Sequence, residues 1–295
     1  GVSISPATGV VNDSTLTCSG SATDADGGTP SFTYAWNVVG NTTILSTTDT
    51  LTLTSALVQP GDEVRCVVTA TDAEGDTDQA DATVDVENRA PVISAIVISP
   101  ATGVKTKTAL TCAVTASDAD GTTTSVSTKW TTGSGTVLAF GTSVTLTPGT
   151  VQPGDEVYCI ATVTDGDGGS TTDQTFVVVE NTAPVVTDVT ISPDTGITTR
   201  ATLSCSGAAT DADGGTPSLS YQWAKQAGGT GTPTNISSAT TNTLTLSPTV
   251  VQPGDNILCR ITATDADGGT AQGTDVVTVD NSDPVVTDVQ IRPDT

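Results

Sequence analysis

Histidine and methionine are absent from this 295-residue sequence, and basic and aromatic side chains are few. Without histidine, catalysis through an imidazole and most zinc sites are excluded. Nine Lys and Arg against 33 Asp and Glu leave a net charge of -24. So few cations cannot neutralise a phosphate backbone, which argues against a nucleic-acid partner. No apolar run approaches the ~18 residues of a membrane-spanning helix, so we expect no membrane insertion in this segment.

Three repeats of about 95 residues, each close to the common size of a domain, run along the chain. Ile-Ser-Pro marks the start of each repeat and Val-Gln-Pro-Gly-Asp its middle, at Ile4–Pro6, Ile98–Pro100, Ile191–Pro193, Val58–Asp62, Val151–Asp155 and Val251–Asp255. We therefore predict domains over residues 1–88, 89–181 and 182–281, followed over 282–295 by a linker and the first strand of a fourth repeat. Because Met is absent and the two ends match in phase, we expect a segment of a longer array.

Alternation of apolar and polar residues within each repeat predicts β-strands. Leu16 and Cys18 alternate with threonines, and Val64, Cys66 and Val68 alternate with a more variable set. Gly, Pro and Asp separate these runs, and no run shows the 3.6-residue period of an amphipathic helix. The pattern predicts an all-β fold of short antiparallel strands packed as sandwiches.

Two cysteines and one tryptophan occur in the same order in each repeat: Cys18, Trp36, Cys66; Cys112, Trp130, Cys159; and Cys205, Trp223, Cys259. This order resembles immunoglobulin-like (Ig-like) domains, in which a disulfide joins strands B and F and a strand-C Trp packs on it. The resemblance implies a tandem array of three Ig-like antiparallel β-sandwiches, one disulfide in each, and an oxidising extracellular or cell-surface location. Six free buried thiols are the alternative. The tyrosine that usually precedes the second cysteine is replaced by Val64, Val157 or Ile257.

A short acidic motif, Asp-x-(Asp/Glu)-Gly, begins six residues after every cysteine. Its acidic residues are Asp24, Asp26, Asp72, Glu74, Asp118, Asp120, Asp165, Asp167, Asp211, Asp213, Asp265 and Asp267, and Asp76 follows the second copy. If the cysteines mark strands B and F, both motifs of a repeat lie in loops at one end of its sandwich. Connectivity brings the preceding linker to the same end, with Glu87-Asn88 or Glu180-Asn181. Carboxylate, amide and backbone oxygens are the ligands that Ca²⁺ prefers, so the sequence predicts calcium at these junctions.

The alternative is that Asp-Gly simply forms good turns that are left solvated. A fixed offset from cysteine in six copies favours the metal. The arrangement is similar to cadherin-like and PKD-like calcium-binding surface repeats, which implies metal held between domains by acidic loops and an Asn-containing linker.

We predict no enzyme. A catalytic carboxylate pair needs two different environments in one cleft, whereas these acids recur in equivalent turns of every repeat. The predicted function is an extracellular structural or adhesive segment that forms a stiff stalk or filament; spacer or carbohydrate-binding modules of a secreted hydrolase are the alternative. Expected partners are neighbouring copies or further repeats end to end, with surface glycans or proteins as further candidates. Three sequons, at Asn12, Asn41 and Asn235, are predicted to lie in accessible turns.

Overall fold

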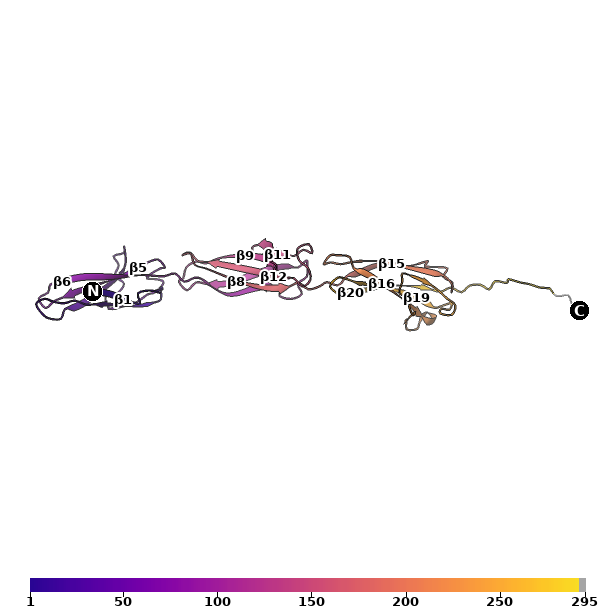
Figure 1. Ribbon diagram of the computed structural model, residues 1–295, viewed down its shortest axis with the longest axis horizontal. Helices are drawn as coiled ribbons and strands as arrows, with labels where there is room; N and C mark the ends of the chain where they lie inside the picture. The colour runs from indigo at the N-terminus through magenta and orange to yellow at the C-terminus, as the bar shows by residue number, and fades with distance from the viewer. Residues whose placement is uncertain (292–295) are drawn as a thin grey trace. The chain divides into compact units, whose positions relative to one another are not determined.

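The computed structural model describes residues 1–291, and strands dominate its secondary structure (Figure 1). The first repeat contains β1 (Val2–Ser5), β2 (Thr15–Gly20), β3 (Ser31–Val38), β4 (Thr50–Thr52), β5 (Glu63–Thr71) and β6 (Thr77–Asp85). The middle repeat contains β7 (Val92–Ser99), β8 (Ala109–Ser117), β9 (Ser125–Thr132), β10 (Val137–Phe140), β11 (Ser143–Thr145), β12 (Glu156–Thr164) and β13 (Ser170–Val178). The third contains β14 (Val185–Ser192), β15 (Thr202–Thr210), β16 (Ser218–Gln226), β17 (Thr234–Asn235), β18 (Thr243–Thr245), β19 (Asn256–Thr264), β20 (Thr270–Thr278) and a single 3₁₀ turn, η1 (Ala227–Gly229).

Each repeat is built from two antiparallel sheets. One sheet has the order β1-β2-β4, β11-β8-β7 or β14-β15-β18, and the other has the order β3-β5-β6, β10-β9-β12-β13 or β17-β16-β19-β20. In Ig-like terms these are the A-B-E and C-F-G sheets, with an extra edge strand on the second sheet of the later repeats. The predicted all-β fold of tandem Ig-like sandwiches is confirmed.

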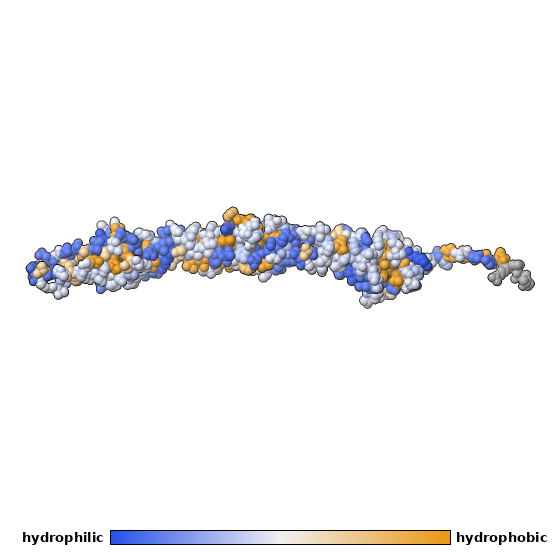
Figure 2. Space-filling view, viewed as in Figure 1, coloured by the Kyte–Doolittle hydropathy of each residue, from blue (hydrophilic) through white to orange (hydrophobic). Residues whose placement is uncertain are grey.

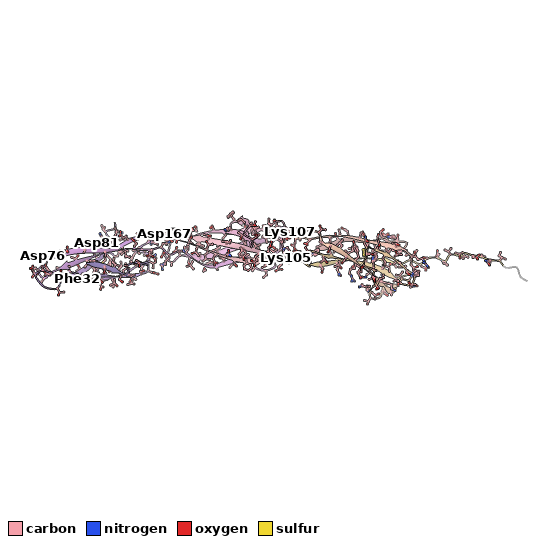
Figure 3. The ribbon with its side chains drawn as sticks, in the orientation of Figure 1. Phe32, Asp76, Asp81, Lys105, Lys107 and Asp167 are labelled. Atoms are coloured by element: carbon pink, nitrogen blue, oxygen red, sulfur yellow. A yellow bond between two sulfur atoms is a disulfide. The ribbon has the colours of Figure 1, made fainter. Side chains whose placement is uncertain are left out.

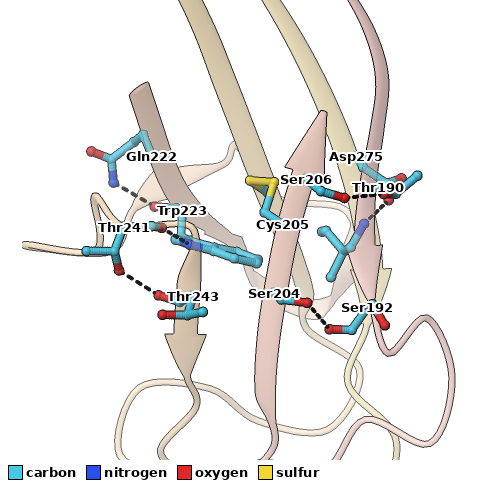
Figure 4. Close-up of a disulfide and its surroundings, with 12 residues drawn as sticks. Thr190, Ser192, Ser204, Cys205, Ser206, Gln222, Trp223, Thr241, Thr243 and Asp275 are labelled. Carbon is cyan, nitrogen blue, oxygen red and sulfur yellow. Dashed lines mark hydrogen bonds between the residues drawn. A yellow bond between two sulfur atoms is a disulfide. The ribbon is translucent and has the colours of Figure 1, made fainter. Parts of the chain in front are cut away.

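A disulfide and a tryptophan lie at the centre of each core. Cys18–Cys66, Cys112–Cys159 and Cys205–Cys259 are paired, which confirms the predicted disulfides. Trp36, Trp130 and Trp223 are fully buried. In the third repeat the Trp223 indole lies beside the disulfide and its Nε1 donates to the carbonyl of Thr241 at 2.9 Å (Figure 4). Each tryptophan therefore belongs to a core and offers no surface platform for a sugar ring.

The Val-Gln-Pro-Gly-Asp motif is a self-contained turn that leads into strand F. In the first repeat, Val58 is buried and the Asp62 carboxylate accepts the N–H of Gln59 at 2.8 Å. Gly61 has a φ of 86°, a conformation that favours glycine. The same Asp-to-Gln contact occurs at Asp155 and Asp255, so the motif is explained by turn chemistry and needs no ligand.

Close contacts divide the chain into two compact units. The first contains Gly1–Ser99, Thr111–Val144 and Tyr158–Phe176; the second contains Pro100–Leu110, Thr145–Val157 and the chain from Val177 onward. The division falls inside the middle repeat. The residues around each repeat junction therefore belong to a single unit, and the domain boundaries at 88, 181 and 281 stay predictions.

Residues 281–291 form no strand in the structure. Figure 1 shows this segment as a single extended chain that leads away from β20. A strand needs a partner for its backbone groups. The first strand of a fourth repeat, predicted within residues 282–295, is therefore not formed over residues 282–291. Residues 292–295 of that prediction lie outside the described residues. Within residues 1–291 no helix is long and apolar enough to cross a membrane.

Candidate functional site at the repeat junctions

Two consecutive linker residues contact both acidic loops of the repeat that follows. At the first junction the Asn88 side-chain amide donates to Asp165 Oδ2 at 3.0 Å, and the backbone N–H of Arg89 donates to Asp120 Oδ2 at 2.6 Å. Asp120 lies in the loop after strand B and Asp165 in the loop after strand F. The linker asparagine and both acidic loops therefore meet, as the connectivity of the sandwich predicts.

The second junction repeats this geometry. The Asn181 amide donates to Asp265 Oδ2 at 3.1 Å, and the Thr182 N–H donates to Asp213 Oδ2 at 2.5 Å. A contact that recurs with equivalent residues is a property of the repeat sequence and is not peculiar to one linker.

The first acid of every motif closes its own turn. One oxygen of Asp24, Asp118 or Asp211 accepts the N–H two residues ahead, at 3.0, 2.7 and 2.9 Å. In the loops after strand F, one oxygen of Asp72, Asp165 or Asp265 accepts two backbone N–H groups of its own turn. Turn chemistry therefore accounts for one oxygen of the first acid in all six copies.

The second acid of the loop after strand B is buried at both junctions. Asp120 is 0% exposed and Asp213 is 3% exposed. Besides the linker N–H, Asp120 Oδ1 accepts from Arg89 Nε at 2.8 Å, and Asp213 Oδ1 accepts from the Thr106 hydroxyl at 2.6 Å. A buried carboxylate is costly unless it is hydrogen-bonded, and here both oxygens have donors. These two carboxylates join the linker to the loop with protein donors alone.

A basic side chain lies at each junction, and the sequence analysis missed both. Arg89 extends from Asp120 back to the first repeat, where its guanidinium donates to Asp13 at 2.9 Å and to Asn12 Oδ1 at 2.8 Å. At the second junction Lys105 Nζ donates to the carbonyl of Asn181 at 2.5 Å and lies 3.4 Å from Glu180. Figure 3 marks Lys105 in the middle repeat. The sequence did contain a signal for Arg89. Basic residues are rare in this chain, and this one directly follows the linker asparagine.

A glycine at the fifth position of the loop makes room for the linker. A Cβ added at Gly169 would lie 2.7 Å from Asn88 Nδ2 and 2.9 Å from the Cα of Ala90; at Gly269 it would lie 2.6 Å from Asn181 Nδ2. The first repeat has Asp76 at this position. Its acidic loop is therefore not shaped to accept an asparagine linker in the same way.

The predicted convergence of the linker carboxylates on these loops is wrong. Glu87 Oε1 accepts the N–H of Gly9 at 2.8 Å, and Glu180 Oε1 accepts the N–H of Gly103 at 2.8 Å. Each glutamate thus turns back into its own repeat and holds the loop between strands A and B. The reason is that its backbone N–H is also bonded there, to Val10 or Val104, which fixes its direction.

The side-chain oxygens of Asn88 and Asn181 are buried and have no hydrogen-bond partner. In each case the amide nitrogen faces the first acid of the loop, while the second acid, Asp167 or Asp267, is exposed. Carboxylate and amide oxygens are the ligands that a hard cation such as Ca²⁺ prefers. No cluster of three or more His, Cys, Asp or Glu side chains that could hold a metal occurs among residues 1–291. A cation at these loops would therefore depend on the asparagine and on backbone oxygens.

The remaining predicted ligands lie apart from any linker contact. Asp24, Asp26, Asp72, Glu74 and Asp76 belong to the first repeat, whose loops have no preceding linker in this chain. Asp118 and Asp211 support their own turns, as described above. The calcium assignment of all these residues stays a prediction.

The sequon at Asn12 is not accessible. Asn12 is 1% exposed, and its side-chain nitrogen, the atom a glycan would occupy, donates to the carbonyl of Asp120 at 2.9 Å. The prediction of an accessible turn is wrong at this site because the junction covers it. Asn41 and Asn235 are exposed.

The asparagine contacts should weaken in acid. The amide of Asn88 lowers the pKa of Asp165; burial acts against this shift and backbone N–H groups add to it. At Asp265 burial raises the pKa, but the Asn181 amide and the backbone N–H groups together outweigh it, so the pKa is again lowered. A carboxylate whose folded pKa is lowered contributes stability above its unfolded pKa and loses it as pH falls through the folded value. We expect the Asn88 and Asn181 side-chain amide signals in NMR spectra to shift together only below about pH 4. Asn281, which faces no loop in this chain, is the internal control; equal shifts at all three would contradict the contact.

No family model and no curated protein matches this chain. Solved structures with a similar fold include a Ca²⁺-stabilised adhesin that helps an Antarctic bacterium reach out and bind ice (16% identity, covering 95% of this chain and 73% of the other, TM-score 0.33). Another is part of a 1.5-MDa bacterial ice-binding adhesin (18% identity, covering 95% of this chain and 98% of the other, TM-score 0.38). A third is a tetra-tandem repeat from the extending region of a large adhesion protein (20% identity, covering 95% of this chain and 73% of the other, TM-score 0.31). At these identities the likeness extends no further than the fold.

Proposed function

We propose that this chain is a segment of an extracellular structural or adhesive array, a stalk or filament whose repeat junctions are stiffened by Ca²⁺. The observation that carries the metal is the buried, unpaired side-chain oxygen of Asn88 and of Asn181, in amides whose nitrogens donate to Asp165 and to Asp265. An unsatisfied buried oxygen is costly, and a bound cation would remove that cost. Three buried disulfides support an oxidising compartment outside the cell.

The proposed ligand set is narrower than the sequence suggested. It consists of Asn88 with Asp165 and Asp167, and Asn181 with Asp265 and Asp267. Asp120 and Asp213 are already hydrogen-bonded by protein donors and serve the junction without metal. We assign no catalytic role, because these acids recur in equivalent loops of every repeat, whereas a catalytic pair needs two different environments in one cleft.

Calcium titration of the intact chain tests this assignment. We expect two sites with dissociation constants of about 10⁻⁴–10⁻³ M, the range of extracellular modules, measured by isothermal calorimetry. Asn181→Ala should remove one site, because it deletes the unpaired oxygen. Asn281→Ala, at the same linker position but away from any acidic loop, should leave both sites.

Stiffening has its own readout. Small-angle scattering should show a narrower distribution of chain dimensions in calcium than in EGTA, with the strand content by circular dichroism unchanged. The ligand set would be wrong if calorimetry detected no calcium binding, or if Asn181→Ala still bound calcium at two sites. The stiffening would be wrong if the scattering profiles in calcium and in EGTA superimposed.

A further inference from the structure

One edge of the C-F-G sheet is left open in the first repeat and is covered by a short strand in the other two. β3 is the edge strand of the first repeat, whereas its counterparts β9 and β16 pair with β10 and β17. In place of such a strand, residues 39–45 form an irregular loop, and one bridge between Trp36 and Ser46 joins the chain beyond it to β3. Val39 and Ile44 in this loop are 42% and 52% exposed. Figure 2 shows apolar residues among hydrophilic ones on the visible face of this repeat. Sheet edges of this kind are usually covered or blunted in proteins.

This loop carries the sequon Asn41–Thr43, and all three of its residues are exposed. Its backbone is anchored to the end of β3. The Asn41 N–H donates to the carbonyl of Val38 at 2.9 Å, and the Asn41 carbonyl accepts the side-chain amide of the buried Asn37 at 2.7 Å. The sequon is therefore held on the surface in a fixed turn.

The Asn41 side chain closes a small turn of its own. Its Oδ1 accepts the backbone N–H of Thr43 at 2.9 Å, an arrangement typical of asparagine in turns. The same hydrogen bond keeps Thr43, whose hydroxyl completes the sequon, beside the asparagine side chain. Among residues 1–291 the amide nitrogen has no acceptor. The oxygen is thus engaged by the chain, and the nitrogen, the atom to which a glycan is attached, stays available.

The sequon at Asn12 lacks this availability. Besides its nitrogen, which donates to Asp120, its side-chain oxygen is also bonded and accepts from Arg89 at 2.8 Å. A sugar at Asn12 would displace both contacts, so the closed junction excludes it.

The sequon at Asn235 is exposed but is held in a different conformation. Asn235 lies in β17 opposite Ala224, and the next residue, Ile236, packs on the core and donates its N–H to the carbonyl of Trp223 at 2.9 Å. Within the described part of the chain, no hydrogen bond joins the Asn235 side chain to Ser237. Only the sequon at Asn41 therefore combines exposure with a closed turn.

We propose that Asn41 is the site of an N-linked glycan. Its Nδ2 forms a bond to the anomeric carbon of a sugar activated on a diphosphate carrier. The bond from that carbon to the phosphate oxygen breaks, the diphosphate leaves with the electron pair, and the amide proton passes to a base of the transferase. A bulky, solubilising group at this position covers the loop with Val39 and Ile44 and lies beside the open edge of β3. The proposal is separate from the calcium sites and does not depend on them.

Glycosylation of the folded, disulfide-bonded chain tests the site. The probe is a nucleoside-diphosphate hexose with a soluble N-glycosyltransferase that accepts Asn-x-Ser/Thr sequences, and peptide mass mapping measures the hexose on each sequon. We expect Asn41 to be modified first, and Asn12 roughly a hundredfold more slowly, because the junction must open to release it. The reduced and alkylated chain is the control. Once circular dichroism shows that its strands are lost, all three sequons should be modified at similar rates.

A matched pair of variants separates the sequon from the loop. Thr43→Ala removes the hydroxyl that a sequon requires but keeps the backbone N–H that closes the turn, and it should abolish modification at Asn41. Thr42→Ala changes the neighbouring exposed residue, which a sequon leaves unspecified, and should retain the modification. Circular dichroism checks that both variants keep their strands. The proposal would be wrong if Asn41 stayed unmodified in the folded chain, if Asn12 or Asn235 were modified as fast as Asn41, or if the two variants behaved alike.

Discussion

Replacing Asp213 with alanine should open the second junction while the sandwiches on either side remain folded. The change leaves two donors, the Thr182 N–H and the Thr106 hydroxyl, without their acceptor in a buried place. Each orphaned donor costs about 1–3 kcal/mol, so we expect a loss of about 3 kcal/mol for the closed junction. Amide hydrogen exchange at Thr182 measures this directly, and its protection should fall roughly a hundredfold.

Asp26→Ala is the control for that experiment. Asp26 has the same position in the acidic motif of the first repeat, but it is exposed and meets no linker. Its replacement should leave exchange at Thr182 and Arg89 unchanged. Unaltered protection of Thr182 in Asp213→Ala would show that the buried carboxylate does not hold the linker.

Removing one disulfide should have the largest effect on a single sandwich. Cys205 and Cys259 close a loop with a sequence separation of 54 residues. On the chain-entropy model this closure contributes about 4 kcal/mol, a large share of the stability of a domain this size. The double variant Cys205→Ala/Cys259→Ala should therefore lower the melting temperature of the third repeat by about 20 °C in calorimetry.

The first repeat serves as the reference within the same molecule. Its Cys18–Cys66 bond, its Trp36 and its core are untouched by the change, so its own transition should stay in place. If reduction or the double variant left every transition unmoved, the disulfides would contribute nothing to the stability of these thin cores.

The two junctions have the same hydrogen-bond geometry but different basic side chains. Arg89 bridges Asp120 to Asp13 of the preceding repeat, and the pKa of its guanidinium is raised by Asp13 and Asp120 against the effect of burial. The second linker has Thr182 in place of Arg89, and its nearby charge comes from Lys105. The contacts shared by both junctions are the asparagine amide and the backbone N–H that follows it, so these are the elements we assign to the repeat itself.

The structure also explains part of the net charge of -24. Many of the acids are acceptors in turns or linkers, where backbone N–H groups and side-chain amides offset their charge. The exposed second acids, such as Asp167 and Asp267, are the ones left for a cation. Calcium at two junctions would cancel only a part of the charge, and the rest remains as solvated surface that resists nonspecific association.

The sequence by itself determined the sandwiches. Period-two alternation places Leu16, Cys18, Val64 and Cys66 on buried faces whatever the neighbouring repeat does, because side chains of a strand point to opposite sides in turn. The Cys-Trp-Cys order selected the Ig-like arrangement, and counting strands from the cysteines placed both acidic loops at the end where the linker arrives.

Only the tertiary structure decided what each acid does there. Local sequence makes Asp118 and Asp120 look alike, yet one closes a turn and the other is buried against Arg89, because burial and donors come from residues far along the chain. The same holds for Glu87, which is held by Val10 and Gly9 of its own repeat, and for Asn12, which the junction covers. Sequence spacing predicts which oxygen atoms lie at one end of a sandwich. Which of them remain available to a metal depends on which ones already accept hydrogen bonds from N–H groups in the folded structure.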